Sequence, residues 1–590
     1  MPSVGRRVAR LLVAGIAAVA LAGCAGLPDS GPAGPGRDVA EAPVEPLRVA
    51  PAGPRPGAGP EEVVSGFLGA GAGFDDDHAV ARTFLAGAAV ASWTPGQRVV
   101  VFPDDASLSM AVHGDTSPVQ VEVHAPVRAT IDSQGRFVQA TPGTKAHAVF
   151  TLSKDSGQWR ISVMDESFGL WLPQYELDRA FSPLRLYFVA TGMKALVPDL
   201  RWVPGPRPAL ATALVRQLIA GPPDYLRGAV VTGIPVGTRL AVEAVPTTDG
   251  IAQVDLTATA LSASPEQRVA LWAQLTATLR QLPSVSGVHI TVNGSAFAIP
   301  GVSGAAVQDD QGYRDDVRVT GAPIVLSGER LLRVDVGTGT VDERGSGSSS
   351  GLPPAPGIGA VSASPQATFA VGVSTNRARL LRLRSDGTAL VLATGGALVD
   401  PTVDARGWTW TADLASPGRL TVVAPVPGAD PVALSPGARR VMEVPWLDGR
   451  TVRALDVSRD GARIAVVSTD RDGSVRLDVG GIVRDDTGQP IRLASNLVVG
   501  RSLRRPTDVA WGDRTSLVVL ALGAKQVVTP YEVVVGGTAT ALAPAPQVVR
   551  VAVGDGLRAV YLTTSSGTVL VRSGDGWRTV GQGRGVTVPQ

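Results

Sequence analysis

Hydrophobic residues follow three different patterns along the 590 residues of the chain. A short apolar run, residues 11–20, stands alone near the N-terminus. Between residues 61 and 301, stretches with an apolar residue every three or four positions are mixed with stretches that alternate apolar and polar residues. From residue 302 onward only the alternation persists. An apolar residue every three or four positions is typical of one face of a helix, and alternation of apolar and polar residues is typical of a strand. We therefore predict two α+β domains followed by an all-β domain.

The first α+β domain is expected at residues 61–184. Val80, Phe84 and Leu85 lie at helical spacing, which predicts a helix capped by the aspartates of residues 75–77. Alternating runs follow, and a turn at residues 155–157 separates the last two. Helices followed by an antiparallel meander predict an α+β fold, and this order of elements would suit an NTF2-like fold, in which helices pack on a curved sheet.

The second α+β domain is expected at residues 185–301. Two helices are marked by leucines four residues apart: Leu210, Leu214 and Leu218 in the first, and Leu271, Leu275 and Leu279 in the second. Ser264 and Gln267 form a capping box ahead of the second helix. Gly221, followed by Pro222 and Pro223, ends the first helix and is predicted to be left-handed. Strands are predicted at residues 185–190, 237–245, 250–258 and 287–294, with Gly237 in a turn.

Paired alternating runs recur from residue 302 to the C-terminus, which predicts a β-propeller. Five such pairs begin near residues 358, 400, 452, 506 and 549, and "APIVLSGERLLRVDV" adds an earlier one. The repeat of roughly 40 to 55 residues is the size of a four-stranded blade. We expect five to seven blades, with six as the expected number.

The apolar run near the N-terminus has the features of a secretory signal, residues 1–23. Arg6, Arg7 and Arg10 precede it, and it is too short to cross a bilayer. Leu21, Ala22, Gly23 and Cys24 resemble the bacterial lipobox, after which Cys24 receives a diacylglyceryl group, typically with palmitate chains, and becomes the mature N-terminus. Two acyl chains hold a protein on a membrane. A plain signal peptide with a chance Cys is the alternative. Residues 24–60, rich in Pro and Gly, are predicted to form a tether.

The composition limits the classes of function that fit the chain. Cys24 is the only cysteine, so the mature chain has no disulfide and no thiolate chemistry in its folded part. A net charge of +2 lacks the basic excess of a nucleic-acid-binding protein. No other segment has eighteen consecutive apolar residues. We therefore expect a lipid-anchored protein on the extracytoplasmic face of the cell membrane, without a nucleic-acid partner.

No set of residues typical of an active site or a metal site is found, so we predict no catalytic residue, no metal and no cofactor. The chain has five histidines, His78, His113, His124, His147 and His289, and none forms an HExxH motif. His113, His124 and His147 fall on predicted strands of one small sheet and could cluster, but chance positions on the sheet are favoured over a zinc site.

Three other motifs have structural explanations, and a fourth stays open. The letters GxSxG at residues 347–351 lie in a Gly/Ser-rich loop rather than between a strand and a helix. Residues 470–473 begin like a calcium loop but lack the acidic residue at position twelve, so a hairpin turn is favoured. The sequon at Asn293 is explained by an Asn-Gly turn. Paired carboxylates such as Asp456 and Asp460 stay open as a catalytic alternative.

The second α+β domain resembles a GerMN domain, and we call residues 185–301 the GerMN unit. The resemblance rests on residues 186–188, 196–198, the "LIAGPP" that holds Gly221, Pro222 and Pro223, the "IPVGT" that holds Pro235, Gly237 and Thr238, and the "VDL" that holds Asp255. We expect structural roles for these residues.

The order of lipobox, tether, two α+β domains and propeller resembles the LpqB family of actinobacterial lipoproteins over nearly the whole chain. The resemblance implies an accessory lipoprotein of the Mtr two-component system, which acts on the extracellular part of a sensor histidine kinase and affects cell-wall processes and division. The alternative is an extracytoplasmic enzyme, or a receptor for cell-wall glycan, built on the propeller, since propellers host many functions.

Overall fold

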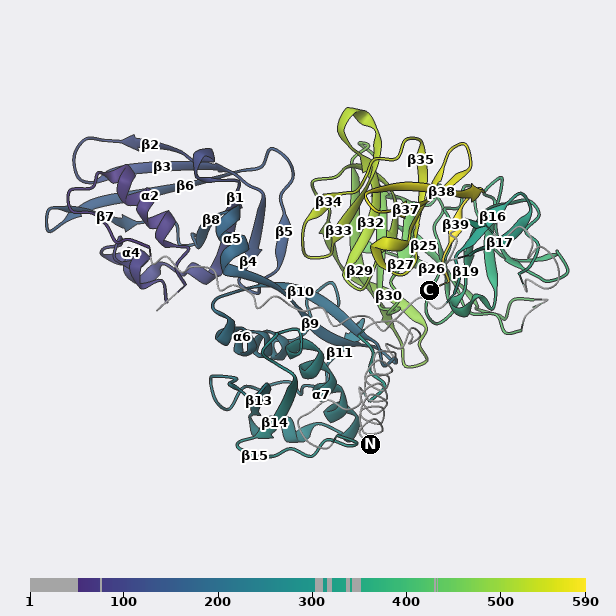
Figure 1. Ribbon diagram of the computed structural model, residues 1–590, viewed down its shortest axis with the longest axis horizontal. Helices are drawn as coiled ribbons and strands as arrows, with labels where there is room; N and C mark the ends of the chain where they lie inside the picture. The colour runs from purple at the N-terminus through teal and green to yellow at the C-terminus, as the bar shows by residue number, and fades with distance from the viewer. Residues whose placement is uncertain are drawn as a thin grey trace, which may run out of the picture. The chain divides into compact units, whose positions relative to one another are not determined.

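The computed structural model describes residues 51–74, 77–302, 311–315, 321–335, 340–341, 352–428, 431 and 433–589 (Figure 1). The described residues fall in one compact unit, Ala50–Gln590. Leu21, Ala22, Gly23, Cys24 and the tether up to residue 50 lie outside the described residues. Within the described part of the chain, no helix is both long and apolar enough to cross a bilayer.

The N-terminal domain packs one long helix on a sheet. α2 (Pro60–Ala70) begins at a proline and buries Val63, Val64, Phe67 and Leu68. Figure 1 shows α2 against the sheet β2–β3–β6–β7, whose strands are β2 (Ser109–His113), β3 (Val119–Pro126), β6 (Lys145–Asp155) and β7 (Gln158–Val163). A second sheet has the order β5–β4–β1–β8, with β1 (Arg98–Phe102), β4 (Ala129–Asp132), β5 (Phe137–Gln139) and β8 (Leu170–Pro173). These elements confirm the predicted α+β fold.

The predicted helix around Val80 and Phe84 is wrong in its length and in its cap. It is split into α3 (Ala79–Arg82) and α4 (Ala88–Ser92). Between them the backbone pairs with Ile161 of β7: the N–H of Ala86 donates to the Ile161 carbonyl at 2.8 Å, and the N–H of Ile161 donates to the Phe84 carbonyl at 2.9 Å. Asp77 does not cap α3: its carboxylate pairs with Arg82 at 2.7 Å, and left-handed His78 precedes the helix. Asp75 and Asp76 lie outside the described residues.

The GerMN unit combines two small sheets with two helices. α6 (Arg207–Ile219) and α7 (Pro265–Leu279) follow the predicted leucine pattern, and the capping box of Ser264 and Gln267 is present. One sheet has the order β10–β9–β11, with β9 (Phe181–Ala190), β10 (Leu196–Pro204) and β11 (Val230–Val231). The other has the order β12–β13–β14–β15, with β12 (Thr247–Thr248), β13 (Ile251–Leu256), β14 (Gly287–Val292) and β15 (Ser295–Ala296). The short helix α5 (Gln174–Ala180) precedes β9.

Two strand predictions in the GerMN unit are wrong. Residues 237–245 form no regular strand, and only Leu240 makes an isolated bridge, to Leu256. β12 pairs with only Ile251 and Ala252 of β13. Residues 239–241 lie along the other end of this edge, where the N–H of Ala241 donates to the Asp255 carbonyl at 2.8 Å and the N–H of Thr257 donates to the Arg239 carbonyl at 2.9 Å, but these contacts do not extend into a regular strand. β10 was not predicted, and it pairs along its whole length with β9.

The described residues from 324 to 587 hold six four-stranded antiparallel sheets. The first is made of β39 (Val586–Thr587), β16 (Ile324–Ser327), β17 (Arg330–Asp335) and β18 (Thr340–Val341). The next two contain β19 (Ile358–Ala363), β20 (Ala370–Ser374), β21 (Arg379–Leu383) and β22 (Ala389–Thr394), then β23 (Thr402–Val403), β24 (Thr409–Thr411), β25 (Arg419–Val423) and β26 (Arg439–Glu443).

The remaining three sheets follow in chain order. They contain β27 (Thr451–Val457), β28 (Arg463–Thr469), β29 (Val475–Arg484) and β30 (Pro490–Val499), then β31 (Arg504–Trp511), β32 (Ser516–Leu522), β33 (Val528–Val534) and β34 (Ala539–Ala541), and finally β35 (Val548–Val553), β36 (Val560–Thr564), β37 (Thr568–Ser573) and β38 (Gly576–Gln582). Each predicted pair of runs forms neighbouring strands of one sheet, which confirms a propeller. The blade number itself stays a prediction.

The GerMN unit and the propeller share one hydrophobic cluster, which includes Leu226 and Val479. The backbone N–H of Gly481 on β29 donates to the carbonyl of Tyr225 at 2.8 Å. A Cβ at Gly481 would lie 2.6 Å from the Cβ of Ala229, so this close approach requires a glycine.

Candidate functional site

The predicted GerMN motif residues support the fold of the unit. Gly221 follows α6 with a φ of +89°, and Gly237 has a φ of +87° in the turn after Pro235. The carboxylate of Asp255 accepts from Thr291 Oγ1 at 2.8 Å and from the N–H of Gly294 at 2.9 Å, and so holds the Asn-Gly turn between β14 and β15. Thr238 is buried. None of these residues, nor Pro222 or Pro223, lines the cavity described next.

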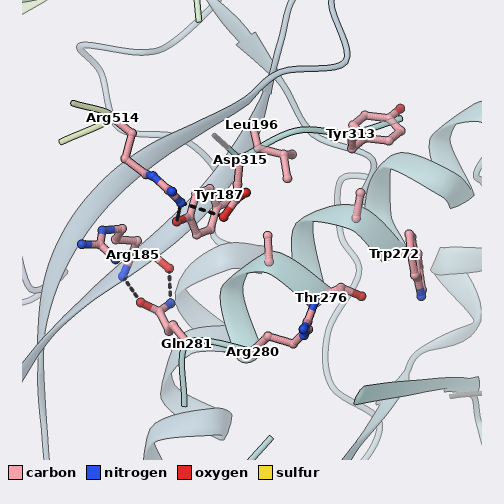
Figure 2. A pocket seen from close by; sticks show the side chains of 12 residues that line it. Arg185, Tyr187, Leu196, Trp272, Thr276, Arg280, Gln281, Tyr313, Asp315 and Arg514 are labelled. Carbon is pink, nitrogen blue, oxygen red and sulfur yellow. Dashed lines mark hydrogen bonds and ion pairs between the residues drawn. The ribbon is translucent and has the colours of Figure 1, made fainter. Parts of the chain in front are cut away.

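A cavity of about 390 Å³ lies beside α7, and we call it the GerMN groove (Figure 2). Its lining comes from β9, β10, α7, residues 313–315 and the turn between β31 and β32: Arg185, Tyr187, Leu196, Trp272, Ala273, Thr276, Ala277, Arg280, Gln281, Tyr313, Asp315 and Arg514. Residues 311–315 are held in place by backbone bonds, because Leu196 N–H donates to the Arg314 carbonyl at 2.8 Å. The groove is therefore assembled from segments far apart in the sequence.

The groove has more positive than negative charge. Three arginines and one aspartate line it. Arg514 is paired, since its Nη1 lies 2.7 Å from Asp315 and 3.4 Å from the hydroxyl of Tyr187. Within the described residues, neither Arg185 nor Arg280 has a carboxylate at ion-pair distance. The excess of guanidinium groups favours an acidic ligand.

Two buried polar atoms of the groove lack hydrogen-bond partners among the described residues. They are Nε of Arg185 and Oγ1 of Thr276. The backbone of Arg185 is satisfied on both sides by the Gln281 amide, whose Oε1 accepts at 2.8 Å and whose Nε2 donates at 2.6 Å. A buried polar atom without a partner costs about 1–3 kcal/mol, so a ligand that supplied partners to both atoms would recover that cost.

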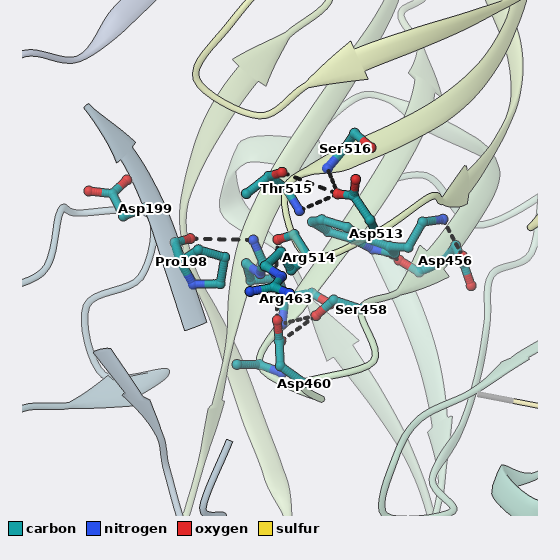
Figure 3. Close-up of polar contacts among 12 residues, drawn as sticks. Pro198, Asp199, Asp456, Ser458, Asp460, Arg463, Asp513, Arg514, Thr515 and Ser516 are labelled. Carbon is teal, nitrogen blue, oxygen red and sulfur yellow. Dashed lines mark hydrogen bonds and ion pairs between the residues drawn. The ribbon is translucent and has the colours of Figure 1, made fainter. Parts of the chain in front are cut away.

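Arg463 fixes the wall of the groove that comes from the propeller (Figure 3). Its side chain is 1% exposed and lies on the Trp511 ring, with 4.5 Å between the guanidinium carbon and the ring centroid. Nη2 pairs with Asp460 and donates to the Arg514 carbonyl at 2.8 Å, while Nη1 donates to the Pro198 carbonyl on β10 at 3.5 Å. Arg463 thus ties β28 to the GerMN unit and to the turn that carries Arg514.

Asp456 and Asp460, the open catalytic alternative, each bind structural donors. Asp456 accepts from the hydroxyl of Thr402 and the N–H of Trp511, both at 2.8 Å. Asp460 accepts from Ser458 and from the N–H of Ala462, and it pairs with Arg463. Both side chains are buried. Both carboxylates are therefore engaged in contacts within the fold.

The inner strands of the propeller enclose a cavity of about 100 Å³. Asp400 pairs there with Arg377 at 2.8 Å and with Arg550. Burial raises the pKa of Asp508 to about 7, although the N–H of Val551 donates to it at 2.8 Å, and burial lowers the pKa of Arg550 to about 10. Cavities that take small molecules usually measure about 300–1,000 Å³, so this one is small for a sugar.

Three of the histidines gather around the carboxylate of Glu122, a clustering that their places on one sheet allowed. Nε2 of His147 lies 2.8 Å from Glu122, that of His124 3.1 Å and that of His113 3.3 Å. His78 is buried before α3, and burial lowers its pKa. His289 is exposed, with Nδ1 2.9 Å from the amide oxygen of Gln253.

The other sequence motifs lie where a structural role was expected or outside the described residues. Residues 470–473 form the turn between β28 and β29, in which Asp470 pairs with Arg450 at 2.8 Å. Asn293 and Gly294 both have positive φ in the turn before β15. The GxSxG letters, residues 347–351, lie outside the described residues.

Sequence reasoning missed the groove and the role of Glu122. Arg185, Thr276, Arg280 and Arg514 come from segments that meet only in the folded chain, and no sequence signal marks them. Glu122 and His124 stand two residues apart on an alternating run, which places both on one face of a strand. That spacing was a usable signal.

Comparison with known proteins covers nearly the whole chain. The family described as "Lipoprotein LpqB, N-terminal domain" matches residues 53–178, "Sporulation and spore germination" matches residues 185–297, and "Lipoprotein LpqB beta-propeller domain" matches residues 335–590. Among solved structures, the first GerMN domain of the sporulation protein GerM from Bacillus subtilis is similar at 20% identity, covering 22% of this chain and 96% of that chain with a TM-score of 0.17.

Two full-length relatives are both named Lipoprotein LpqB. The one from Thermobifida fusca is 29% identical, with 90% of each chain covered. The one from Cutibacterium acnes is 30% identical, with 98% of each chain covered. Together with the three matched domain families along this chain, these matches show that the chain belongs to the LpqB family of lipoproteins.

Proposed function

We propose that the protein is a lipid-anchored, extracytoplasmic accessory lipoprotein that binds the extracellular domain of an Mtr-type sensor histidine kinase. Binding modulates the kinase, and through it cell-wall processes and division. Membership of the LpqB family supports this function, since the resemblance of the chain to that family implies it. The protein acts by contact and carries out no reaction of its own.

The observation that carries the proposal is the set of unpaired polar groups in the GerMN groove. Arg185 and Arg280 offer guanidinium groups, and Arg185 Nε and Thr276 Oγ1 are buried without partners among the described residues. Trp272 and Tyr313 supply aromatic surface beside them. Arginine and aromatic residues dominate the energetics of protein interfaces. An acidic side chain on a loop of the sensor domain fits this groove.

The lipid anchor at Cys24 raises the effective concentration of the protein near the sensor domain. Two partners confined to one membrane meet at an effective concentration of about 1 mM, so a contact with a dissociation constant of about 10 µM is largely occupied. A modest, polar interface is then sufficient. Replacing Cys24 by Ser should release the protein or leave an unprocessed precursor, and labelling with a fatty-acid probe should be lost.

The test of the groove is the substitution Arg280→Glu. Arg280 is exposed at the end of α7, so charge reversal should leave the fold intact. Titration calorimetry of the full chain against the purified sensor domain should show at least a tenfold loss of affinity, because the substitution replaces attraction of an acidic partner group by repulsion. The matched control is Arg239→Glu, an exposed arginine of the same unit that does not line the groove.

Two results would count against the proposal. Equal affinity for the Arg280→Glu and Arg239→Glu variants would remove the groove from the interface. No contact at all between the full chain and the sensor domain, together with unchanged kinase output in cells that lack the protein, would leave the propeller-based glycan receptor or enzyme as the better interpretation.

A further inference from the structure

The exposed face of the sheet β2–β3–β6–β7 carries three histidines and a glutamate in neighbouring positions. On β3, Glu122 and His124 are two residues apart and so share a face. His147 on β6 stands directly opposite His124, and Ala111 and Val149 stand opposite Glu122 from the two neighbouring strands. His113 on β2 lies on the same face, two positions from Ala111.

The side chains converge on the carboxylate of Glu122. Its Oε1 lies 2.8 Å from Nε2 of His147 and 3.1 Å from Nε2 of His124, and its Oε2 lies 3.3 Å from Nε2 of His113. The rings of His124 and His147 lie 4.8 Å apart between centroids. One donor atom from each of Glu122, His124 and His147 falls within 4.8 Å of the others. No other such group of three occurs among the described residues.

We propose that Glu122, His124 and His147 form a binding site for a divalent transition-metal ion of the zinc type. Two imidazoles and a carboxylate are common zinc ligands, with bonds of about 2.0–2.2 Å. Ligand atoms in tetrahedral coordination then lie about 3.3–3.5 Å apart. Here Oε1 of Glu122 lies 2.8 Å and 3.1 Å from the two Nε2 atoms, and all three donor atoms fall within 4.8 Å of one another. This site departs from the sequence-based expectation of no metal, because only strand register brings His147 beside His124.

The cluster is open to an ion from solvent. Metal binding requires an ionised carboxylate and neutral imidazoles. The side chains of His124 and His147 are 46% and 50% exposed. An ion can therefore reach both Nε2 atoms from solvent, and water completes its coordination.

His113 acts as a positioning residue. Its Nε2 faces Oε2 of Glu122, on the side of the carboxylate away from His124 and His147. A partner of this kind orients a carboxylate ligand, and its loss typically weakens metal binding about 10- to 100-fold. On β2, Ala111 with its small side chain stands opposite Glu122 and two residues from His113.

The test is zinc binding by the full chain in detergent after treatment with a chelator. Equilibrium dialysis against Zn²⁺ should show one ion per chain. His124→Ala and His147→Ala should each weaken binding at least about tenfold, and so should Glu122→Gln and His113→Ala, which act through the carboxylate. Replacement by Co²⁺ gives a second readout, because its visible absorption reports coordination by nitrogen ligands and should vanish in the His124→Ala/His147→Ala double variant.

His289→Ala is the matched control, because His289 is also an exposed histidine on a strand, β14, with an amide partner. It should leave zinc binding unchanged, and circular dichroism should be the same for all variants. The proposal is overturned if the chain binds no Zn²⁺, if the double variant still binds one ion with the original affinity, or if His289→Ala weakens binding as much as His147→Ala.

Discussion

The GerMN groove and the centre of the propeller use the same residue types, arginine and aspartate, in opposite ways. In the propeller centre the charged groups are partnered within the fold: Asp400 pairs with Arg377 and Arg550, and Asp508 accepts a backbone N–H. In the groove, Arg185 and Arg280 have no carboxylate partner among the described residues. Charges satisfied within the fold hold strands together, whereas unsatisfied ones favour a partner from outside.

The largest effect should come from breaking a satisfied network. Arg463→Met removes the cation that pairs with buried Asp460 and leaves that carboxylate uncompensated. Breaking a buried pair from one side costs about 3–5 kcal/mol, so the melting temperature should fall strongly. Arg419→Met is the matched control, because its pair with Glu443 is exposed and such pairs contribute about 0–1 kcal/mol. Equal changes in melting temperature would contradict the buried role of Arg463.

The second effect is a dependence of stability on pH that Asp508 sets. Its pKa is raised to about 7 in the folded chain from about 3.9 when unfolded. Between these values the folded state binds one more proton at Asp508, so the contribution of this group to stability is greatest below about pH 4 and is lost as pH rises through 7. Asp508→Asn removes this loss, which is at most about 4 kcal/mol, and keeps an acceptor for Val551.

Thermal unfolding at several pH values checks this prediction. The melting temperature of the Asp508→Asn variant should exceed that of the unchanged chain by a margin that grows from pH 4 to pH 8. Asp386 is an exposed control whose pKa is lowered by hydrogen bonds from Thr388, so Asp386→Asn should act in the opposite direction at neutral pH. A constant margin for the Asp508 variant would show that its carboxyl titrates normally.

Local patterns were sufficient for elements whose own residues carry the signal. α7 has buried leucines at every fourth position and a capping box, and both were predicted. The propeller pairs were predicted because each has two alternating runs around a polar turn, as at Ser458 and Gly461 between β27 and β28. In these places short-range sequence determines the structure.

Elements that depend on distant contacts were missed. β10 contains Asp199 and Arg201, both buried polar residues that break the apolar alternation. Asp199 is satisfied by Arg201 and by the hydroxyl of Tyr225 at 3.0 Å, and no local pattern reveals that partner. The groove and the histidine cluster were missed for the same reason, because Arg280 meets Arg185, and His147 meets His124, only after folding.

Two threonines of α7 sharpen the comparison between satisfied and unsatisfied groups. Thr278 Oγ1 accepts a hydrogen bond from the backbone N–H of Tyr187 at 3.2 Å, whereas Thr276 Oγ1 is buried and has no partner among the residues that the structure describes. Thr278→Val should cost about 1–3 kcal/mol by leaving that N–H unpaired, whereas Thr276→Val should be neutral or stabilising. Chemical denaturation measures both. If Thr276→Val destabilised as much as Thr278→Val, its hydroxyl would have a partner within the fold.

The smallest effect should come from a substitution at Gly221, which lowers the stability of the GerMN unit at a position that does not line the groove. Gly221 has a φ of +89°, and a Cβ placed there would meet no atom within 4 Å. Gly221→Val should therefore cost about 1–2 kcal/mol through backbone strain alone. Gly221→Asn is the control, because asparagine tolerates the left-handed region, and it should cost less than Val. Denaturation should show this order, while affinity for the sensor domain should stay unchanged in both variants. A loss of affinity with Gly221→Val would mean that binding depends on the stability of the whole GerMN unit. It would then count against a specific contribution of the unpaired groove groups to binding.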